Sequence, residues 1–194
     1  MVLIMLKKLG ARNVDYANRG MTLEADLGAT NDFYLINDIA IIYKKPTPIT
    51  IAKVNYPSRA DAVIKEGYFR TPSTTDYNGI YKGKYIDFEA KETKSHTSFP
   101  LNNIHRHQIE HLSRICKHGG IGFLIVRFTT INKTFLLTFE ALEEFLNSSD
   151  RKSIPLSYFM DNGYIIKDRY NPRVDYISII DRLYFGGVKW KRNF

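Results

Sequence analysis

The spacing of apolar residues along the chain alternates between the period of a helix and the period of a strand. The pattern predicts helices over residues 15–36, 103–118 and 141–147. It predicts strands over residues 39–43, 49–56, 75–81, 84–91, 121–128 and 134–139. Residues 164–167 and 176–185 read either as two strands or as a strand and a helix. This order predicts an α/β fold in one domain, with a mixed central β-sheet flanked by helices on both sides.

The turn between the strands at 75–81 and 84–91 has two candidates. Lys82-Gly83 and Asn78-Gly79 both have the composition of a tight β-hairpin turn. Gly119-Gly120 marks the end of the helix at 103–118. The sequence leaves the choice between the two hairpin turns open.

The predicted strand at 84–91 has one apolar face and one charged face. Alternate side chains of a strand lie on the same side of the sheet. The apolar face carries Ile86, Phe88 and Ala90, and the charged face carries Asp87, Glu89 and Lys91. Three charges on one face of a core strand are costly to bury without a partner or a metal ion. The charged face is therefore the first indication of a functional site.

Composition narrows the class of partner. The chain has 194 residues, a net charge of +8, 13 Tyr and 12 Phe. An excess of positive charge favours a polyanionic partner, most simply a nucleic acid. The single Cys116 excludes an internal disulfide, and the apolar run at residues 1–6 precedes its lysines, unlike a secretory signal. We therefore expect a cytoplasmic protein.

The segment at 44–69 is basic and carries three prolines. Pro46 and Pro48 exclude a helix at its start. The positive charge of the segment comes from Lys44, Lys45, Lys53, Arg59 and Lys65. The residues alone allow either a projecting arm or an edge hairpin packed on the domain.

Asp76 and Glu89 together suit a hard divalent cation. Two carboxylates and a backbone carbonyl, for which Ala90 is well placed, make an oxygen site of the kind that Mg²⁺ prefers. Such a cation can acidify a water and stabilise charge on a phosphodiester. Lys91 shares the face of Glu89 and can orient the water or neutralise the phosphate, while Thr74 can add an oxygen. The spacing predicts a metal-dependent nuclease.

An Asp followed at a distance by Glu-x-Lys is the pattern of the PD-(D/E)xK nuclease superfamily. Thr75 stands where that pattern has a proline.

Longer runs resemble the RecU family of Holliday junction resolvases, in the same order and over residues 17–184. The runs are Arg-Gly-Met-Thr-Leu-Glu (19–24), Lys-Lys-Pro-Thr-Pro (44–48), Thr-Thr-Asp-Tyr-Asn-Gly-Ile-Tyr-Lys-Gly (74–83), Tyr-Ile-Asp-Phe-Glu-Ala-Lys-Glu-Thr (85–93), Thr-Ser-Phe-Pro-Leu (97–101), His-Gln-Ile-Glu-His (107–111) and Pro-Arg-Val-Asp-Tyr-Ile (172–177).

This resemblance implies a restriction-endonuclease-like core that nicks two strands of a four-way DNA junction symmetrically, as a homodimer, in recombination and repair. It implies Mg²⁺, or Mn²⁺ in its place, at positions matching Thr74, Asp76, Glu89 and Gln108, with Lys91 stabilising the transition state. It implies that 44–69 is a stalk entering the junction, and that a recombinase and branch-migration proteins are partners. The expected DNA contacts, from the resemblance and the charge of the segment, are Lys44, Lys45, Arg59, Lys65 and Phe69.

Two other interpretations remain. His107-x-x-Glu110-His111 matches the H-x-x-E-H pattern of inverted zinc proteases, with both histidines one helical turn apart. The chain could also be a junction-binding, strand-pairing module without cleavage as its main activity. Residues 1–16 and 186–194 are expected to be flexible termini.

Overall fold

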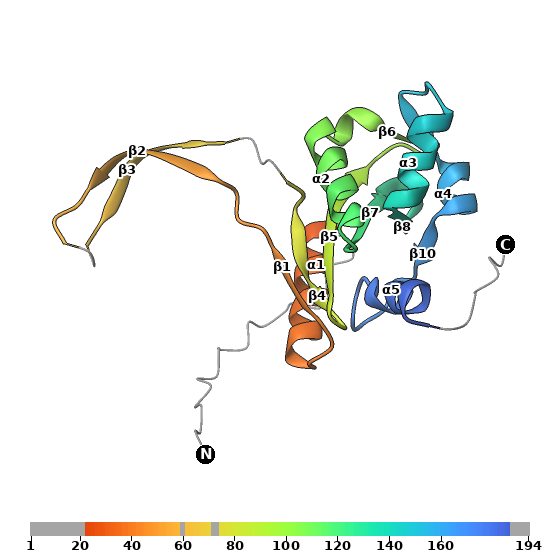
Figure 1. Cartoon of the computed structure of the whole chain (residues 1–194), viewed down its shortest axis with the longest axis horizontal. Helices are drawn as coiled ribbons and strands as arrows, with labels where there is room; N and C mark the ends of the chain where they lie inside the picture. The colour runs from red at the N-terminus through yellow and green to blue at the C-terminus, as the bar shows by residue number, and fades with distance from the viewer. Residues whose placement is uncertain (1–21, 59–60, 71–73, 187–194) are drawn as a thin grey trace, which may run out of the picture.

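A computed structural model describes residues 22–58, 61–70 and 74–186 of the chain. Its centre is a six-stranded sheet with the strand order β1-β4-β5-β7-β8-β10 (Figure 1). The strands are β1 (Ile41–Lys44), β4 (Tyr77–Tyr81), β5 (Lys84–Thr93), β7 (Ile121–Phe128), β8 (Lys133–Thr138) and β10 (Tyr164–Ile166). The central pair β5–β7 is parallel and the other neighbouring pairs are antiparallel, which confirms the predicted mixed sheet.

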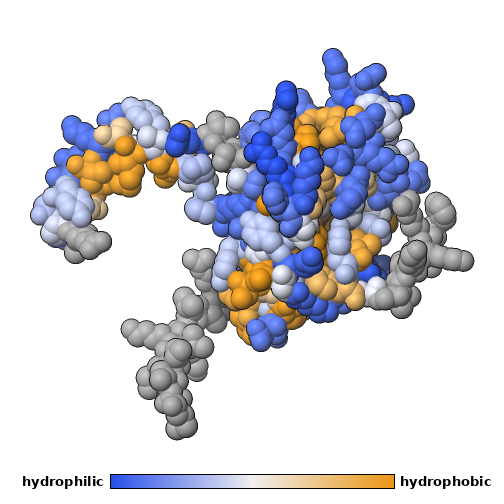
Figure 2. Space-filling view, viewed as in Figure 1, coloured by the Kyte–Doolittle hydropathy of each residue, from blue (hydrophilic) through white to orange (hydrophobic). Residues whose placement is uncertain are grey.

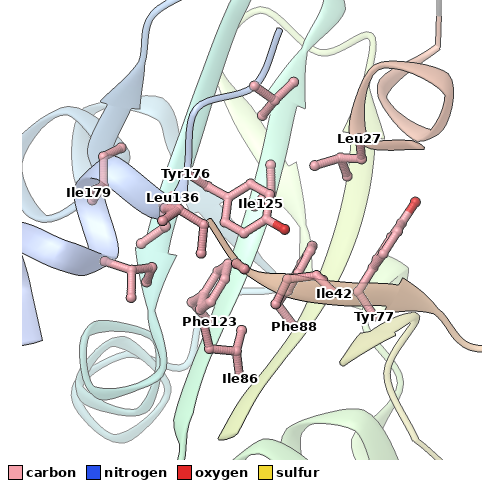
Figure 3. Packing of buried hydrophobic residues seen from close by; sticks show 14 of the residues in the cluster. Leu27, Ile42, Tyr77, Ile86, Phe88, Phe123, Ile125, Leu136, Tyr176 and Ile179 are labelled. Atoms are coloured by element: carbon pink, nitrogen blue, oxygen red, sulfur yellow. The ribbon is translucent and has the colours of Figure 1, made fainter. Parts of the chain in front are cut away.

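Helices cover both faces of the sheet, as the order of elements predicts. One face packs against α1 (Leu23–Ile36) and α5 (Ile177–Tyr184), whose buried residues join those of β5 and β7 in one core cluster (Figure 3). The opposite face packs against α2 (Arg106–Lys117), α3 (Phe139–Ser148) and α4 (Leu156–Asn162). The remaining short elements are β6 (Ser98–Pro100), η1 (Leu101–Asn103), η2 (Thr129–Ile131) and β9 (Ser153–Pro155).

A column of aromatic rings fixes the central strands relative to one another. Phe88 of β5 stacks between Tyr77 of β4 and Phe123 of β7, with ring centroids 4.8 Å and 4.7 Å apart. All three residues are buried on the α1 side of the sheet. Because side chains alternate along β5, Asp87 and Glu89 must lie on the α2 side. The packing of the apolar face therefore sets the position of the charged face.

The segment at 44–69 takes the projecting form. Strands β2 (Ile49–Asn55) and β3 (Val63–Phe69) pair only with each other, as an antiparallel ribbon that leaves the body directly after β1 (Figure 1). Every residue of both strands is exposed. We call this ribbon the stalk.

Several predicted boundaries differ from the structure. Helix α1 begins at Leu23 because the Thr22 hydroxyl accepts a hydrogen bond from the Ala25 amide and caps the helix; residues 15–21 lie outside the described residues. The hairpin turn is Lys82-Gly83, with positive φ at both residues. Residues 177–184 form a helix. Of the predicted flexible termini, only Gly186 is described, and its amide donates to the Asp181 carbonyl.

Gly79 lies inside β4, which excludes the second candidate turn. A Cβ atom at this position would lie 2.0 Å from the Ile41 carbonyl oxygen of the neighbouring strand. Glycine is therefore needed here for close strand approach. Among the described helices, none is long and apolar enough to cross a membrane.

Candidate active site

Three predicted residues meet where β4 and β5 pair. Asp76 directly precedes β4, and its backbone amide donates a hydrogen bond of 3.0 Å to Glu89 Oε2. Lys91 Nζ lies 2.5 Å from Glu89 Oε1 and 3.9 Å from Asp76 Oδ2. The two carboxylates and the ammonium group predicted from the sequence thus form one cluster at the end of the central strands.

Glu89 is the buried member of the cluster. Its side chain has no exposed surface, whereas the side chains of Asp76 and Lys91 are 35% and 27% exposed. Burial raises the pKa of Glu89 to about 7, and the negative charge of Asp76 adds to this effect while Lys91 opposes it. Glu89 Oε1 has the Lys91 ammonium group, 2.5 Å away, as its partner. A positive charge placed between the carboxylates would therefore stabilise ionised Glu89.

The donor set fits a divalent cation. Asp76 and Glu89 contribute hard carboxylate oxygens from adjoining segments, and in this structure Lys91 is the only cation within 4 Å of both among the described residues. Asp76 and Lys91 border a hollow of about 530 Å³ between the start of α1, the foot of the stalk and the end of β5, and Glu89 lies buried behind them. Thr74 and Ala90 also line this hollow, and their expected role as oxygen ligands remains a prediction. The hollow provides room for a phosphate group beside the carboxylates.

Gln108 is buried in the first turn of α2. Its side-chain oxygen Oε1 accepts a hydrogen bond of 2.9 Å from the His105 amide. Oε1 is the only atom of this side chain able to bind a cation, and it retains a second lone pair. The predicted role of Gln108 as a ligand remains a prediction.

The charged face of β5 holds a second centre that the sequence pattern leaves unassigned. Asp87 is fully buried, and Lys45 Nζ lies 2.8 Å from its Oδ2 atom. Asp87 also accepts hydrogen bonds from the Thr75 and Tyr85 hydroxyls and contacts His111 Nε2. The alternation of charges along β5 singles out Asp87 in the sequence. It does not identify the partners of Asp87, because most of these come close only in the folded chain.

The H-x-x-E-H pattern does not assemble a zinc site. His111 turns to Asp87, and Glu110 pairs with Arg106 at 2.8 Å. His107 stacks on His105, with its Nε2 atom buried and unpaired. Within residues 22–58, 61–70 and 74–186, no three His, Cys, Asp or Glu side chains gather as a metal-binding group. The donor geometry therefore gives the protease interpretation no support.

The predicted DNA contacts fall into two groups. Lys65 and Phe69 lie on the stalk, and the Phe69 side chain is 81% exposed. Lys44 lies at the rim of the hollow and pairs with Glu24 at 2.5 Å. Lys45 instead turns inward to Asp87, and Arg59 lies outside the described residues.

Comparison with known proteins decides the family. A family model described as "RecU: Recombination protein U" matches residues 18–182, which include the whole cluster around Asp76. The chain belongs to the RecU family. This finding confirms the resemblance drawn from the sequence runs.

Close RecU relatives align over nearly the full chain. "Holliday junction resolvase RecU" of Geobacillus sp. (strain WCH70) is 54% identical over 184 residues, 93% of this chain and 92% of the relative. The proteins of the same name from Geobacillus thermodenitrificans (strain NG80-2) and Bacillus cytotoxicus are 56% and 53% identical. These two alignments cover 88% of this chain and 87% and 86% of the relatives. Among solved structures, Archaeoglobus fulgidus Hjc, a Holliday junction resolvase, is similar with a TM-score of 0.42 and 14% identity, over 74% of this chain and 93% of that chain.

Proposed function

We propose that this chain is a Mg²⁺-dependent endonuclease that resolves four-way DNA junctions by paired nicks. The observation that carries the proposal is the cluster of Asp76, Glu89 and Lys91 beside a hollow large enough for a phosphate group. The names of its RecU relatives, which align over 88% to 93% of this chain, support the same substrate.

In this proposal Asp76, Glu89 and the Ala90 carbonyl hold the cation, with Thr74 and Gln108 adding oxygens directly or through water. Bound there, Mg²⁺ supplies Lewis acidity toward a phosphate oxygen and acidifies a water. Lys91, which pairs with Glu89 in this structure, would be free to donate to the phosphate as negative charge grows on it if a bound cation neutralised Glu89. The buried Glu89 carboxylate has little freedom to move, so its position is already set when DNA arrives.

The stalk and the segment that leads into it, residues 44–48, recognise the junction in this proposal. We call this segment the stalk foot. Lys44, Arg59 and Lys65 contact phosphates in this proposal, and exposed Phe69 stacks on bases, whereas Lys45 turns inward to Asp87. Phosphate contacts carry little sequence information and depend strongly on salt. Selectivity for four-way DNA then comes from the shape of the stalk and its position relative to the cleavage site.

Two exposed apolar surfaces support a homodimer. On the α2 side of the sheet, paired residues Ile41 and Ile80 are 44% and 48% exposed. On the stalk, Ile49 and Ile64 flank Gly67, since a Cβ added there would lie within 4 Å of both side chains. Figure 2 shows apolar surface gathered on the ribbon. An isolated two-stranded ribbon is only marginally stable in water. A second copy of the chain would cover both apolar surfaces. A two-fold dimer also gives the two equivalent sites that symmetric nicks require.

The substitution Ile80→Asp tests the dimer. A buried charge in the interface should produce monomers at low micromolar concentration, measured by light scattering during gel filtration. Ile165→Asp is the control, because Ile165 is 50% exposed on β10 at the far edge of the sheet. An unchanged dimer with Ile80→Asp would show that this face lies outside the interface.

The substitution Glu89→Gln tests cleavage and separates it from the strand-pairing alternative. It should lower Mg²⁺-dependent nicking of a synthetic mobile junction by more than about 100-fold while junction binding in EDTA stays unchanged. Glu110→Gln, at an exposed glutamate on α2, is the matched control. Normal cutting by Glu89→Gln would contradict the assigned site. Wild-type protein that binds junctions but never nicks them would favour the strand-pairing module.

A further inference from the structure

The buried carboxylate of Asp87 contacts Lys45, which precedes the stalk in the chain, and Thr75, which follows it. The chain leaves the body at Lys45 and returns at Thr75, on either side of the ribbon. The Lys45 ammonium lies 2.8 Å from Asp87 Oδ2 and 3.0 Å from the Thr75 hydroxyl, which in turn donates to Asp87 Oδ1. Asp87 has no exposed surface, and the Lys45 side chain is only 18% exposed.

The same contacts reach the proposed catalytic cluster. The Lys45 amide donates a hydrogen bond of 2.7 Å to the Asp76 carbonyl. Asp76 follows Thr75 directly, and Asp87 lies two residues before Glu89 on the same face of β5. His111 of α2 and the Tyr85 hydroxyl complete the polar shell of Asp87 at 3.1 Å and 3.0 Å. The segment that leads into the stalk is therefore bonded directly to Asp76 through the Lys45 amide.

We propose that the Lys45–Asp87 ion pair is a clamp that positions Asp76 according to how the stalk is seated on DNA. Lys45 and Asp87 are positioning residues in this proposal: the Lys45 side chain lines the hollow, but its ammonium group is held by Asp87. A half-buried ammonium paired with a fully buried carboxylate holds its geometry firmly, because removing the ammonium leaves an uncompensated buried charge. The clamp rests on the proposed nuclease function, and it replaces the phosphate contact that the charge of Lys45 predicts.

The test compares Lys45→Met, Lys45→Arg and the exposed-lysine control Lys152→Met in the full chain. Lys45→Met should slow single-turnover nicking of a junction by about 10-fold to 100-fold at saturating protein, because Asp76 is misplaced. Junction affinity in EDTA and its salt dependence should stay within about a factor of three, because the charge of Lys45 is already neutralised by Asp87 and not by a phosphate. Lys45→Arg should recover at least half of the lost rate, and Lys152→Met should match wild type.

Hydrogen exchange gives a readout that does not depend on cleavage. The amide at position 45 should exchange at least about 10-fold faster in Lys45→Met than in wild type, since its bond to the Asp76 carbonyl opens more often. The double variant Lys45→Met/Asp87→Asn leaves no unpaired charge, so it separates folding from positioning. It should regain the melting temperature of wild type while nicking stays slow.

Each outcome decides the proposal. A large loss of affinity for junction and duplex alike, with a shallower salt dependence and a normal saturated rate, would make Lys45 a DNA contact and overturn the clamp. Recovery of both melting temperature and rate in the double variant would reduce the pair to a structural role. Unchanged amide exchange would overturn the clamp even if wild-type protein proved not to cut junctions. Failure of the wild-type protein to cut junctions would count against the nuclease function alone.

Discussion

The Lys91 ammonium group lies between two carboxylates, 2.5 Å from Glu89 Oε1 and 3.9 Å from Asp76 Oδ2. It therefore holds the place that a cation would take between these groups. Proton, ammonium and metal ion all compete for the same buried negative charge. This competition leads to two predictions that can be measured without DNA.

The stability of the metal-free protein should depend on pH through Glu89. The folded carboxyl group keeps its proton up to a pKa of about 7, whereas the ordinary value is 4.5. Between these values the unfolded state binds fewer protons, so stability falls as the pH rises. The loss is on the order of 3 kcal/mol between pH 4.5 and 7. Urea unfolding in EDTA at pH 5 and pH 8 should show it in wild type and not in Glu89→Gln. The same pH dependence in both proteins would contradict the assignment.

Removal of the competing ammonium should separate metal binding from chemistry. Lys91→Met should bind Mg²⁺ as tightly as wild type or more tightly by calorimetry. Its nicking rate should fall by about 10²-fold to 10³-fold, because the charge on the phosphate loses its donor. Lys167→Met, at an exposed lysine, is the control. A loss of Mg²⁺ binding in Lys91→Met would mean that Lys91 organises the ligands instead.

The stalk should be removable without unfolding the body. The Arg70 amide donates to the Pro48 carbonyl at 2.9 Å, so these residues can be joined by a short turn in place of 49–69. The body should keep its melting temperature within a few degrees, because the ribbon adds no residue to either core cluster. Preference for four-way over linear DNA, measured by competition at fixed salt, should disappear. A shortened protein with normal preference would place junction recognition elsewhere, and gel filtration should record whether it is still a dimer.

Two glycine-to-alanine substitutions should have opposite effects. Gly79→Ala puts a Cβ atom 2.0 Å from the Ile41 carbonyl oxygen and should destabilise the protein by about 2 kcal/mol or more. Gly28→Ala on α1 meets nothing within 4 Å and should stabilise it by about 0.5–1 kcal/mol. Urea unfolding of both variants checks the signs. An equal effect in both would contradict the close approach of β1 and β4.

The sequence predicted best those strands and helices whose apolar residues recur with a clear local period. The run at 121–128 is β7 to the residue, and the alternation along 84–91 placed Phe88 and Glu89 on opposite faces. The three-residue strands β6 and β9 and the seven-residue α4 went unpredicted, because so few residues show no clear period.

In the candidate site too, residues related by local spacing were predicted, whereas contacts between distant parts of the chain were not. Asp76, Glu89 and Lys91 were found because their spacing is carried by one hairpin. The inward course of Lys45 was not found, because Asp87 is 42 residues away and charge alone favours an exposed lysine. Thr75 shows the same limit: it appeared only as a departure from a motif, yet its hydroxyl lies against Asp87.

Strand β5 also sets how the chain tolerates changes in length. It contributes Phe88 to the aromatic stack, Asp87 and Glu89 to buried polar centres, and Glu92, whose carboxylate accepts from the Leu23 amide at the start of α1. A one-residue insertion here would turn every later side chain to the opposite layer and exchange charge for aromatic ring. Natural length variation should therefore be absent from β5 and concentrated in the stalk, where added or lost residue pairs change reach and leave the interior untouched.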